Sequence, residues 1–143
     1  MKRGYLKRKS KSRTSQIRGE IQRVLREIVM LRDKGCILRN LRHCGGTLDT
    51  EGVVIQADHL ITRANSATYA DSRLVVCICK GCHGWKHWHE KEYDLLIKTI
   101  LPKKTIELWD KCQLESWRPS KMDWSSELVA LEQELKNEQK SLY

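Results

Sequence analysis

The sequence of 143 residues has no phenylalanine, two prolines and no long apolar run. Since a membrane-spanning helix needs about 20 consecutive apolar residues, none is expected. Acidic side chains are absent from residues 1–19, which carry eight Lys or Arg, whereas residues 20–143 carry 19 basic and 18 acidic side chains. We therefore expect one nearly neutral domain with a modest core and a cationic N-terminal arm.

The N-terminus also lacks the apolar stretch of a secretory signal, which predicts a cytoplasmic protein. Six cysteines in such a chain favour metal ligands or reactive thiols over disulfides.

Residues 1–16 have no apolar periodicity and are predicted to form a flexible basic arm. Such an arm either keeps the protein soluble or follows a phosphate backbone, from which it releases counterions. Five arm residues are candidates for contacts with nucleic acid: Lys7, Arg8, Lys9, Lys11 and Arg13.

Residues 17–101 are predicted to form the core of an α+β fold. An amphipathic helix runs from Ile17 to the stop signal Lys34-Gly35. Turn signals predict a hairpin between residues 47–48 and 53–55, with a strand over 53–57. Residues 61–71 suit a loop, residues 74–77 a short strand, and a helix is expected from Cys82.

Residues 102–143 are predicted to be a helical extension that packs on the core or on a partner. One helix ends before Pro102, and the next covers residues 103–114. The last helix has Asp123 or Ser125 as N-cap and three leucines on one face, which suggests a homodimer contact. These leucines are Leu128, Leu131 and Leu135.

The cysteine spacing predicts a structural zinc site. Cys79 and Cys82 form a Cys-x2-Cys knuckle, and the partner pair is most economically Cys36 and Cys44, although seven residues separate them. Either His43 or Cys77 is an alternative to Cys44, and free thiols are the alternative to zinc. Cys77 ends an apolar run and is expected in the core. Cys112, within a helical pattern, is expected to be buried.

A candidate catalytic dyad, Asp58-His59, lies between the two cysteine pairs at the end of a predicted strand. A carboxylate suits Mg²⁺, and an imidazole can activate a water molecule. His83 and His87 are four residues apart and therefore share one helix face just after the knuckle. Zinc would hold this helix start against the hairpin, so that His83 can reach a metal on Asp58. His87 is either a second ligand or an exposed surface histidine.

Two basic side chains near the dyad, Arg63 and Lys86, are candidates for phosphate contacts, although isolated basic residues are often only solvated.

These residues together resemble the zinc-bound HNH (ββα-metal) endonucleases, and most resemble the phage recombination endonucleases of the NinG/Rap type. The resemblance is carried by the cysteine pairs, Asp58-His59, Leu74-Val75-Val76 and the sequence Cys79-Lys80-Gly81-Cys82-His83-Gly84-Trp85-Lys86-His87. It extends from the helix ending at residues 31–34 through the C-terminal helices.

The resemblance implies a role for each matching residue. Asp58 and His83 would bind the catalytic Mg²⁺ or Mn²⁺, His59 would be the general base, and the four cysteines would hold structural zinc. The family often has an asparagine where this chain has Leu74, so another group must fix the loop. The first cysteine pair is also more widely spaced than in the family.

The expected function is therefore that of a metal-dependent DNA endonuclease in phage recombination or DNA processing. Branched or junction DNA is among the substrates that this function would include. The endonuclease would act in an infected or lysogenic bacterial cell, together with phage recombination proteins. The alternatives are a non-catalytic, zinc-stabilised DNA-binding protein, such as a phage regulator or packaging accessory, and a zinc-scaffolded interaction protein. The dyad and His83 favour the nuclease, because a binding protein does not require an acid-histidine pair beside a phosphate.

Overall fold

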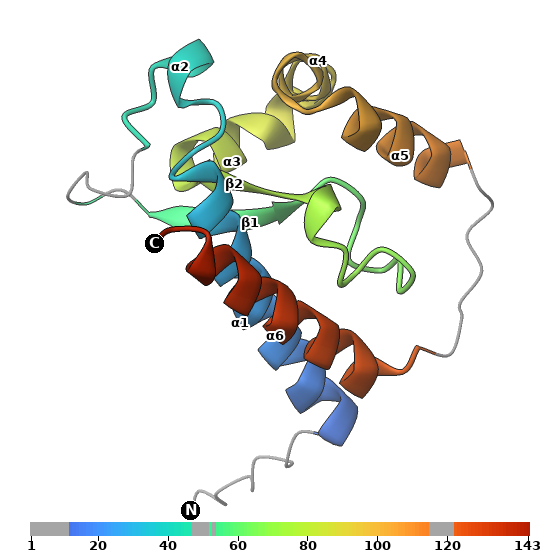
Figure 1. The fold of residues 1–143 in the computed structure, drawn as a ribbon. Coiled ribbons are helices and arrows are strands. Elements are labelled where there is room, and N and C mark those ends of the chain that lie inside the picture. The colour runs from blue at the N-terminus through green and yellow to red at the C-terminus, as the bar shows by residue number, and fades with distance from the viewer. Residues whose placement is uncertain (1–11, 47–51, 53, 115–121) are drawn as a thin grey trace, which may run out of the picture.

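The structure, a computed structural model, describes residues 12–46, 52, 54–114 and 122–143 (Figure 1). It has the predicted α+β architecture. The elements in chain order are α1 (Arg13–Asp33), α2 (Arg39–Arg42), β1 (Ile55–His59), the 3-10 turn η1 (Ser72–Leu74), β2 (Val75–Cys79), α3 (Lys80–Trp88), α4 (Glu90–Ile100), α5 (Lys103–Leu114) and α6 (Trp124–Lys140).

Helix α1 begins before the predicted start at Ile17. The hydroxyl of Ser12 caps the helix by accepting a hydrogen bond from the amide of Ser15 at 3.2 Å, and residues 13–16 form the first turn instead of belonging to the arm. The helix ends at Lys34, whose φ of 57° is left-handed, as the Lys34-Gly35 signal predicted. Of the apolar face predicted for this helix, Ile21, Val24, Leu25 and Ile28 are buried and Ile17 and Leu31 are partly buried; Val29 is buried as well.

The two strands form an antiparallel pair in which Ile55 lies opposite Cys79 and His59 lies opposite Val75. One arm of the hairpin predicted between residues 47–48 and 53–55 lies outside the described residues, so that hairpin stays a prediction; in the described chain β1 pairs with β2. All five residues of β2 are buried, and α3 starts directly after it. The result is a strand-strand-helix unit whose strand β1 carries Asp58 and His59.

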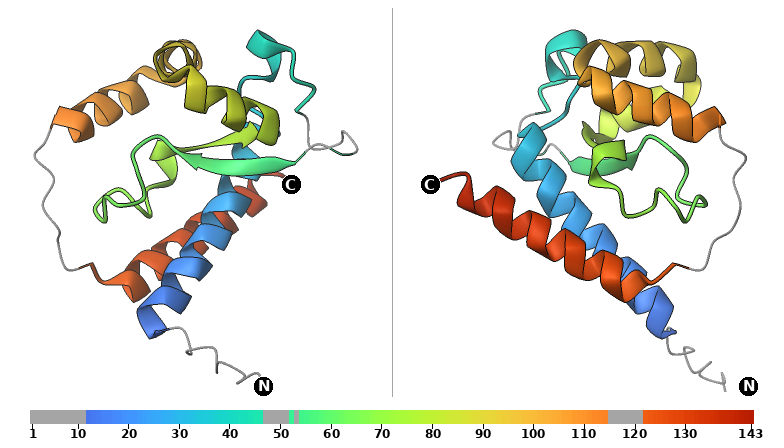
Figure 2. Two further views of the ribbon diagram at one scale, coloured as in Figure 1. Left: turned by 180° about the vertical axis from the view of Figure 1, so that it is seen from behind. Right: turned by 45° about the vertical axis from the view of Figure 1, so that its right-hand side comes forward.

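Helix α6 lies alongside α1 and runs parallel to it, as the two orientations show (Figures 1 and 2). Asp123 is the N-cap, as one of the two sequence alternatives predicted. Leu131 is buried, and Leu128 and Leu135 are partly buried against the core. The leucine face on which a homodimer contact was suggested therefore packs against the core of the same chain.

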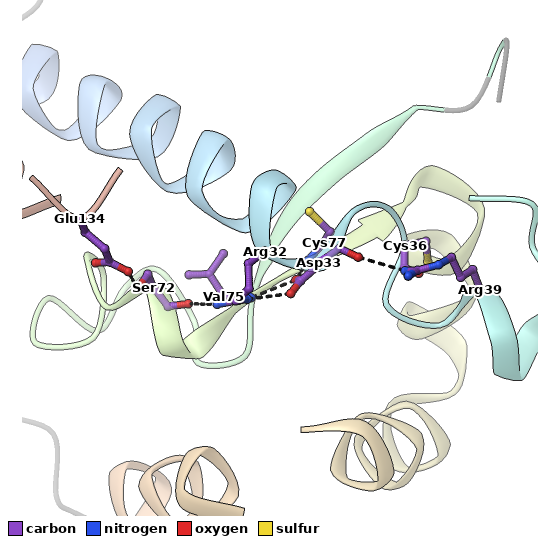
Figure 3. A network of polar contacts seen from close by, with 8 residues as sticks. All are labelled: Arg32, Asp33, Cys36, Arg39, Ser72, Val75, Cys77 and Glu134. Carbon is purple, nitrogen blue, oxygen red and sulfur yellow. Dashed lines mark hydrogen bonds and ion pairs between the residues drawn. The ribbon is translucent and has the colours of Figure 1, made fainter. Parts of the chain in front are cut away.

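The C-terminal end of α1 is fastened to β2 by a network of polar contacts (Figure 3). The guanidinium of Arg32 donates to the carbonyl oxygens of Ser72 at 2.9 Å and of Val75 at 2.6 Å. Asp33 binds the same guanidinium and also accepts a hydrogen bond from the amide of Cys77 at 3.0 Å. Because β2 continues into α3, this network fixes α1 relative to the strand that ends in the cysteine knuckle.

Helices α4 and α5 complete the core through Tyr93, Ile97 and Trp109, all nearly inaccessible to solvent. They are separated at Pro102, as predicted, and α5 has the predicted bounds. Among the described residues, no helix combines the length and the apolar character needed to cross a membrane.

Candidate metal centre and adjoining acid-histidine site

Four cysteines form a compact cluster between the end of α1 and the start of α3. The Sγ atoms of Cys36, Cys44, Cys79 and Cys82 all lie within 4.8 Å of one another. Four thiolates bound tetrahedrally at about 2.3 Å from zinc would be about 3.8 Å apart, so the cluster fits a structural zinc ion. In the part of the chain that the structure describes, no other group of three or more His, Cys, Asp or Glu side chains is gathered in this way.

The backbone brings the two pairs together by different means. Cys79 is the N-cap of α3, and its sulfur accepts a hydrogen bond from the amide of Cys82 at 3.4 Å. The other pair is closed by left-handed residues at His43 (φ 48°) and Gly45 (φ 64°). The amide of Cys36 also donates to the carbonyl of Gly46 at 2.5 Å. Cys44, and not Cys77 or His43, is therefore the fourth member of the cluster.

The surroundings of the cluster shift the pKa values of its thiols in different directions. Burial raises the pKa of Cys36 to about 11, and burial together with the neighbouring Cys36 raises the pKa of Cys82. Burial also acts to raise the pKa of Cys79. Hydrogen bonds from Cys82 and from the other thiols outweigh this effect and bring the pKa of Cys79 below its usual value. A divalent cation would displace the protons of these thiols, because thiolates are the ligands of zinc.

A guanidinium lies next to the cluster. Arg42 donates from Nη1 to the sulfur of Cys82 at 3.2 Å, and its Cζ lies 4.0 Å from the ring centroid of Trp85. Since four thiolates around Zn²⁺ carry a net charge of −2, the positive charge of Arg42 offsets part of it.

The two remaining cysteines lie outside the cluster. Cys77 is fully buried in β2, as predicted, and burial followed by the charge of Asp33 raises its pKa to about 12. Cys112 on α5 is only partly buried, which is less than the burial that the helical pattern predicted.

The carboxylate of Asp58 faces α3 and α4, and its side chain is 8% exposed. Its Oδ2 accepts hydrogen bonds from Lys86 Nζ at 2.7 Å and from the Tyr93 hydroxyl at 2.6 Å. Its Oδ1 lies 3.8 Å from Nε2 of His83. The structure therefore brings Asp58 and His83 together, as the sequence predicted, while Lys86 pairs with Asp58.

His87 packs edge-on against His83, with 4.8 Å between the ring centroids. The predicted helix face shared by the two histidines is thus present. His87 thus contacts His83, the histidine nearest to Asp58. Its role as a metal ligand stays a prediction.

His59 faces the opposite side of β1 from Asp58, as expected for neighbours in a strand. Its Nε2 lies 3.1 Å from the carbonyl oxygen of Tyr69 and 3.4 Å from the side-chain amide of Gln22 on α1. Burial is the main cause that lowers its pKa, and the positive charges of Arg63 and Lys86 act in the same direction. The burial of His59 therefore favours its neutral form.

The loop that follows β1 is held by short-range hydrogen bonds. Asn65 accepts at its Oδ1 from the amide of Ala67 at 3.1 Å, and the amide of Leu60 donates to the carbonyl of Leu74 at 2.9 Å. Leu74 itself is buried in the core. Asn65 thus fixes a local turn, and the Leu60–Leu74 hydrogen bond joins the start of the loop to the residue before β2.

The predicted nucleic-acid contacts are distributed unevenly over the described chain. Arg63 is exposed on the loop after His59, and Arg13 is exposed at the start of α1. Lys7, Arg8, Lys9 and Lys11 lie outside the described residues.

Two residues of the site were missed by the sequence analysis. Tyr93 lies in the helix that was predicted to end before Pro102 and had no role assigned to it, although a buried tyrosine hydroxyl usually requires a partner. Asp33 was read only as part of the helix end, and nothing in the sequence links it to the amide of Cys77 44 residues later.

Comparison of the chain with protein-family models, with curated proteins and with solved structures finds no match to any of them.

Proposed function

We propose that the protein is a metal-dependent endonuclease that hydrolyses phosphodiester bonds in DNA and is similar to the zinc-bound HNH nucleases. The observation that carries this proposal is the approach of His83 Nε2 to within 3.8 Å of Asp58 Oδ1, between β1 and α3. An oxygen and a nitrogen at this separation can both bind one divalent ion. The adjoining four-cysteine cluster is the second feature that such nucleases share.

His59 has the properties of a general base. The carbonyl of Tyr69 can only accept a hydrogen bond, so its 3.1 Å contact with Nε2 favours the neutral tautomer of His59 that has its proton on Nε2 and a lone pair on Nδ1. The longer contact of Nε2 with the side-chain nitrogen of Gln22, at 3.4 Å, would favour the other tautomer. Burial lowers the pKa of His59 and so favours the neutral imidazole. His59 could then take a proton from a water molecule that attacks the phosphorus atom.

Asp58 and His83 would hold Mg²⁺ or Mn²⁺, which would supply positive charge to the phosphate during hydrolysis. Zinc at the four cysteines would be structural, because all four ligand positions are filled by protein. Arg63 and the basic residues of the N-terminal segment would contact the DNA backbone. A role in phage recombination, on branched DNA, is part of the same proposal and rests on the sequence resemblance.

A second candidate is a DNA-binding protein that uses zinc for stability and has no catalytic activity. The observation that favours it is the ion pair between Lys86 and Asp58, since a carboxylate neutralised in this way does not require a metal ion.

The two functions are separated by assaying cleavage of linear, nicked, flap and four-way-junction DNA in Mg²⁺, Mn²⁺ and EDTA. We expect cleavage that requires a divalent ion and that falls at least about 100-fold in His59→Ala, because the general base is lost. Zinc content, thermal stability and DNA binding should change little.

His89→Ala is the matched control, because the ring of His89 also contacts a backbone carbonyl, that of Trp85, at 3.1 Å. It should retain wild-type cleavage. Equal rates for the wild type and His59→Ala would contradict the catalytic assignment. DNA binding by the wild type without cleavage of any substrate would favour the second candidate.

A further inference from the structure

The two oxygens of the Asp58 carboxylate have different surroundings. Oδ2 accepts from both Lys86 Nζ and the Tyr93 hydroxyl, at 2.7 and 2.6 Å. Oδ1 faces the imidazole of His83 at 3.8 Å, a separation too long for a hydrogen bond. The carboxylate is thus anchored at one oxygen and available at the other.

Of the two donors, Tyr93 is the more rigid. Its side chain is 1% exposed and is packed in the core on α4, whereas the side chain of Lys86 is 23% exposed. The ammonium of Lys86 also lies 4.7 Å from the ring centroid of Tyr93, so the phenol contributes to placing Lys86 as well. Rotation of the Asp58 carboxylate would break two hydrogen bonds to a charged acceptor, which are stronger than hydrogen bonds between neutral groups.

We propose that Tyr93 is a positioning residue for a divalent-ion site. Its hydroxyl holds Asp58 so that Oδ1 alone is presented to the ion, opposite His83. This inference rests on the metal site of the proposed function. A single fixed carboxylate oxygen suits Mg²⁺ and Mn²⁺, because Mg²⁺ requires near-octahedral geometry and usually keeps several water molecules.

Lys86 has a different effect on the same site. Its positive charge lies against the carboxylate that would bind the cation, so it opposes cation binding electrostatically. The site should therefore hold a readily exchangeable divalent ion, unlike the four-cysteine cluster.

The test is Mn²⁺ binding to the zinc-loaded protein without DNA, measured by the electron paramagnetic resonance signal of free Mn²⁺. Removal of the hydroxyl in Tyr93→Phe should raise the Mn²⁺ dissociation constant about tenfold, as losses of second-sphere contacts commonly do. Lys86→Met should leave the dissociation constant unchanged or lower it. Asp58→Asn should abolish binding.

Ser72→Ala is the matched control, because the hydroxyl of Ser72 likewise donates to a carboxylate, that of Glu134 (Figure 3), in a partly buried contact that does not involve Asp58. It should bind Mn²⁺ as the wild type does. Thermal unfolding and zinc content, measured on every variant, show that the fold is retained.

An unchanged dissociation constant in Tyr93→Phe would overturn the inference, as would an equal weakening in Lys86→Met or the absence of Asp58-dependent Mn²⁺ binding. If Mn²⁺ binds as expected but no DNA is cleaved, the endonuclease proposal fails and the positioning role of Tyr93 stands. If DNA is cleaved and Tyr93→Phe binds Mn²⁺ normally, only the positioning role fails.

Discussion

At the scale of single residues, Gly46 is the most constrained position in the cysteine cluster. A Cβ atom on Gly46 would lie 2.5 Å from Cβ of Cys36, 3.2 Å from Cβ of Cys79 and 3.3 Å from Sγ of Cys44. The first of these contacts is far shorter than a van der Waals separation, and the atom contacted is the Cβ of a cysteine in the cluster. The absence of a side chain at Gly46 is therefore required for the cluster to close.

We expect Gly46→Ala to lower the free energy of unfolding by about 3 kcal/mol, at the upper end of the range for overpacked cores. It should also lower the zinc content of the purified protein. Denaturant unfolding and metal analysis measure the two effects.

Gly19→Ala provides the control, because an added Cβ there has no neighbour within 4 Å and Gly19 lies inside α1. This change should stabilise the protein by up to about 1 kcal/mol through helix propensity. Wild-type stability and zinc content in Gly46→Ala would contradict the proposed constraint.

Single residues also show where sequence reasoning succeeds. The predicted grouping of four cysteines, Cys36, Cys44, Cys79 and Cys82, is confirmed by their cluster, because closely spaced cysteine pairs are typical of metal ligands. Tyr93 and Asp33 were not found, because their partners are 35 and 44 residues away in the chain. Such contacts depend on how helices pack, and the local pattern contains no information about that.

At the scale of elements, packing of α6 on α1 attaches the last helix of the chain to the core. The face of α6 was predicted from its leucine spacing, but the spacing does not identify the surface that the leucines cover. In the structure Leu131 is 3% exposed, whereas Val129 on the same helix is 65% exposed. The two positions separate the packed face from the solvent-facing one.

We expect Leu131→Ala to destabilise the protein by about 3 kcal/mol, because it leaves a cavity between two helices. Val129→Ala should change the free energy of unfolding by no more than about 0.5 kcal/mol. Thermal or denaturant unfolding of both variants provides the comparison. Equal effects would mean that α6 does not pack on α1 through this face.

At the scale of the whole molecule, most of the excess positive charge lies in the segment that precedes the first helix. The first 11 residues include six Lys or Arg, and α1 begins with its own cap at Ser12. The predicted boundary of the arm at residue 16 cut into this helix, because Arg13–Gln16 are polar and give no apolar signal. Removal of residues 1–11 is therefore the truncation that leaves α1 intact.

This truncation should weaken DNA binding and reduce its dependence on salt. Each basic residue that contacts a phosphate contributes about 0.9 to the slope of log affinity against log salt. Titrations of labelled duplex DNA at several salt concentrations measure the slope. Substitution of the exposed Lys103 and Lys104 by Gln is the control for loss of charge alone. If the truncated protein showed the wild-type slope, the N-terminal segment would not contact DNA, and its role would be to keep the protein soluble.

The strand register connects the four cysteines to the chemistry of a site they do not touch. Cys79 is both the last residue of β2 and a member of the cluster, and it lies opposite Ile55. A shift of β1 by one residue would exchange its two faces, so that Asp58 would turn toward α1 and His59 toward α3. By holding Cys79 in place, a zinc ion would limit such a shift, and would thereby determine which of two adjacent side chains meets His83 and which meets Tyr69.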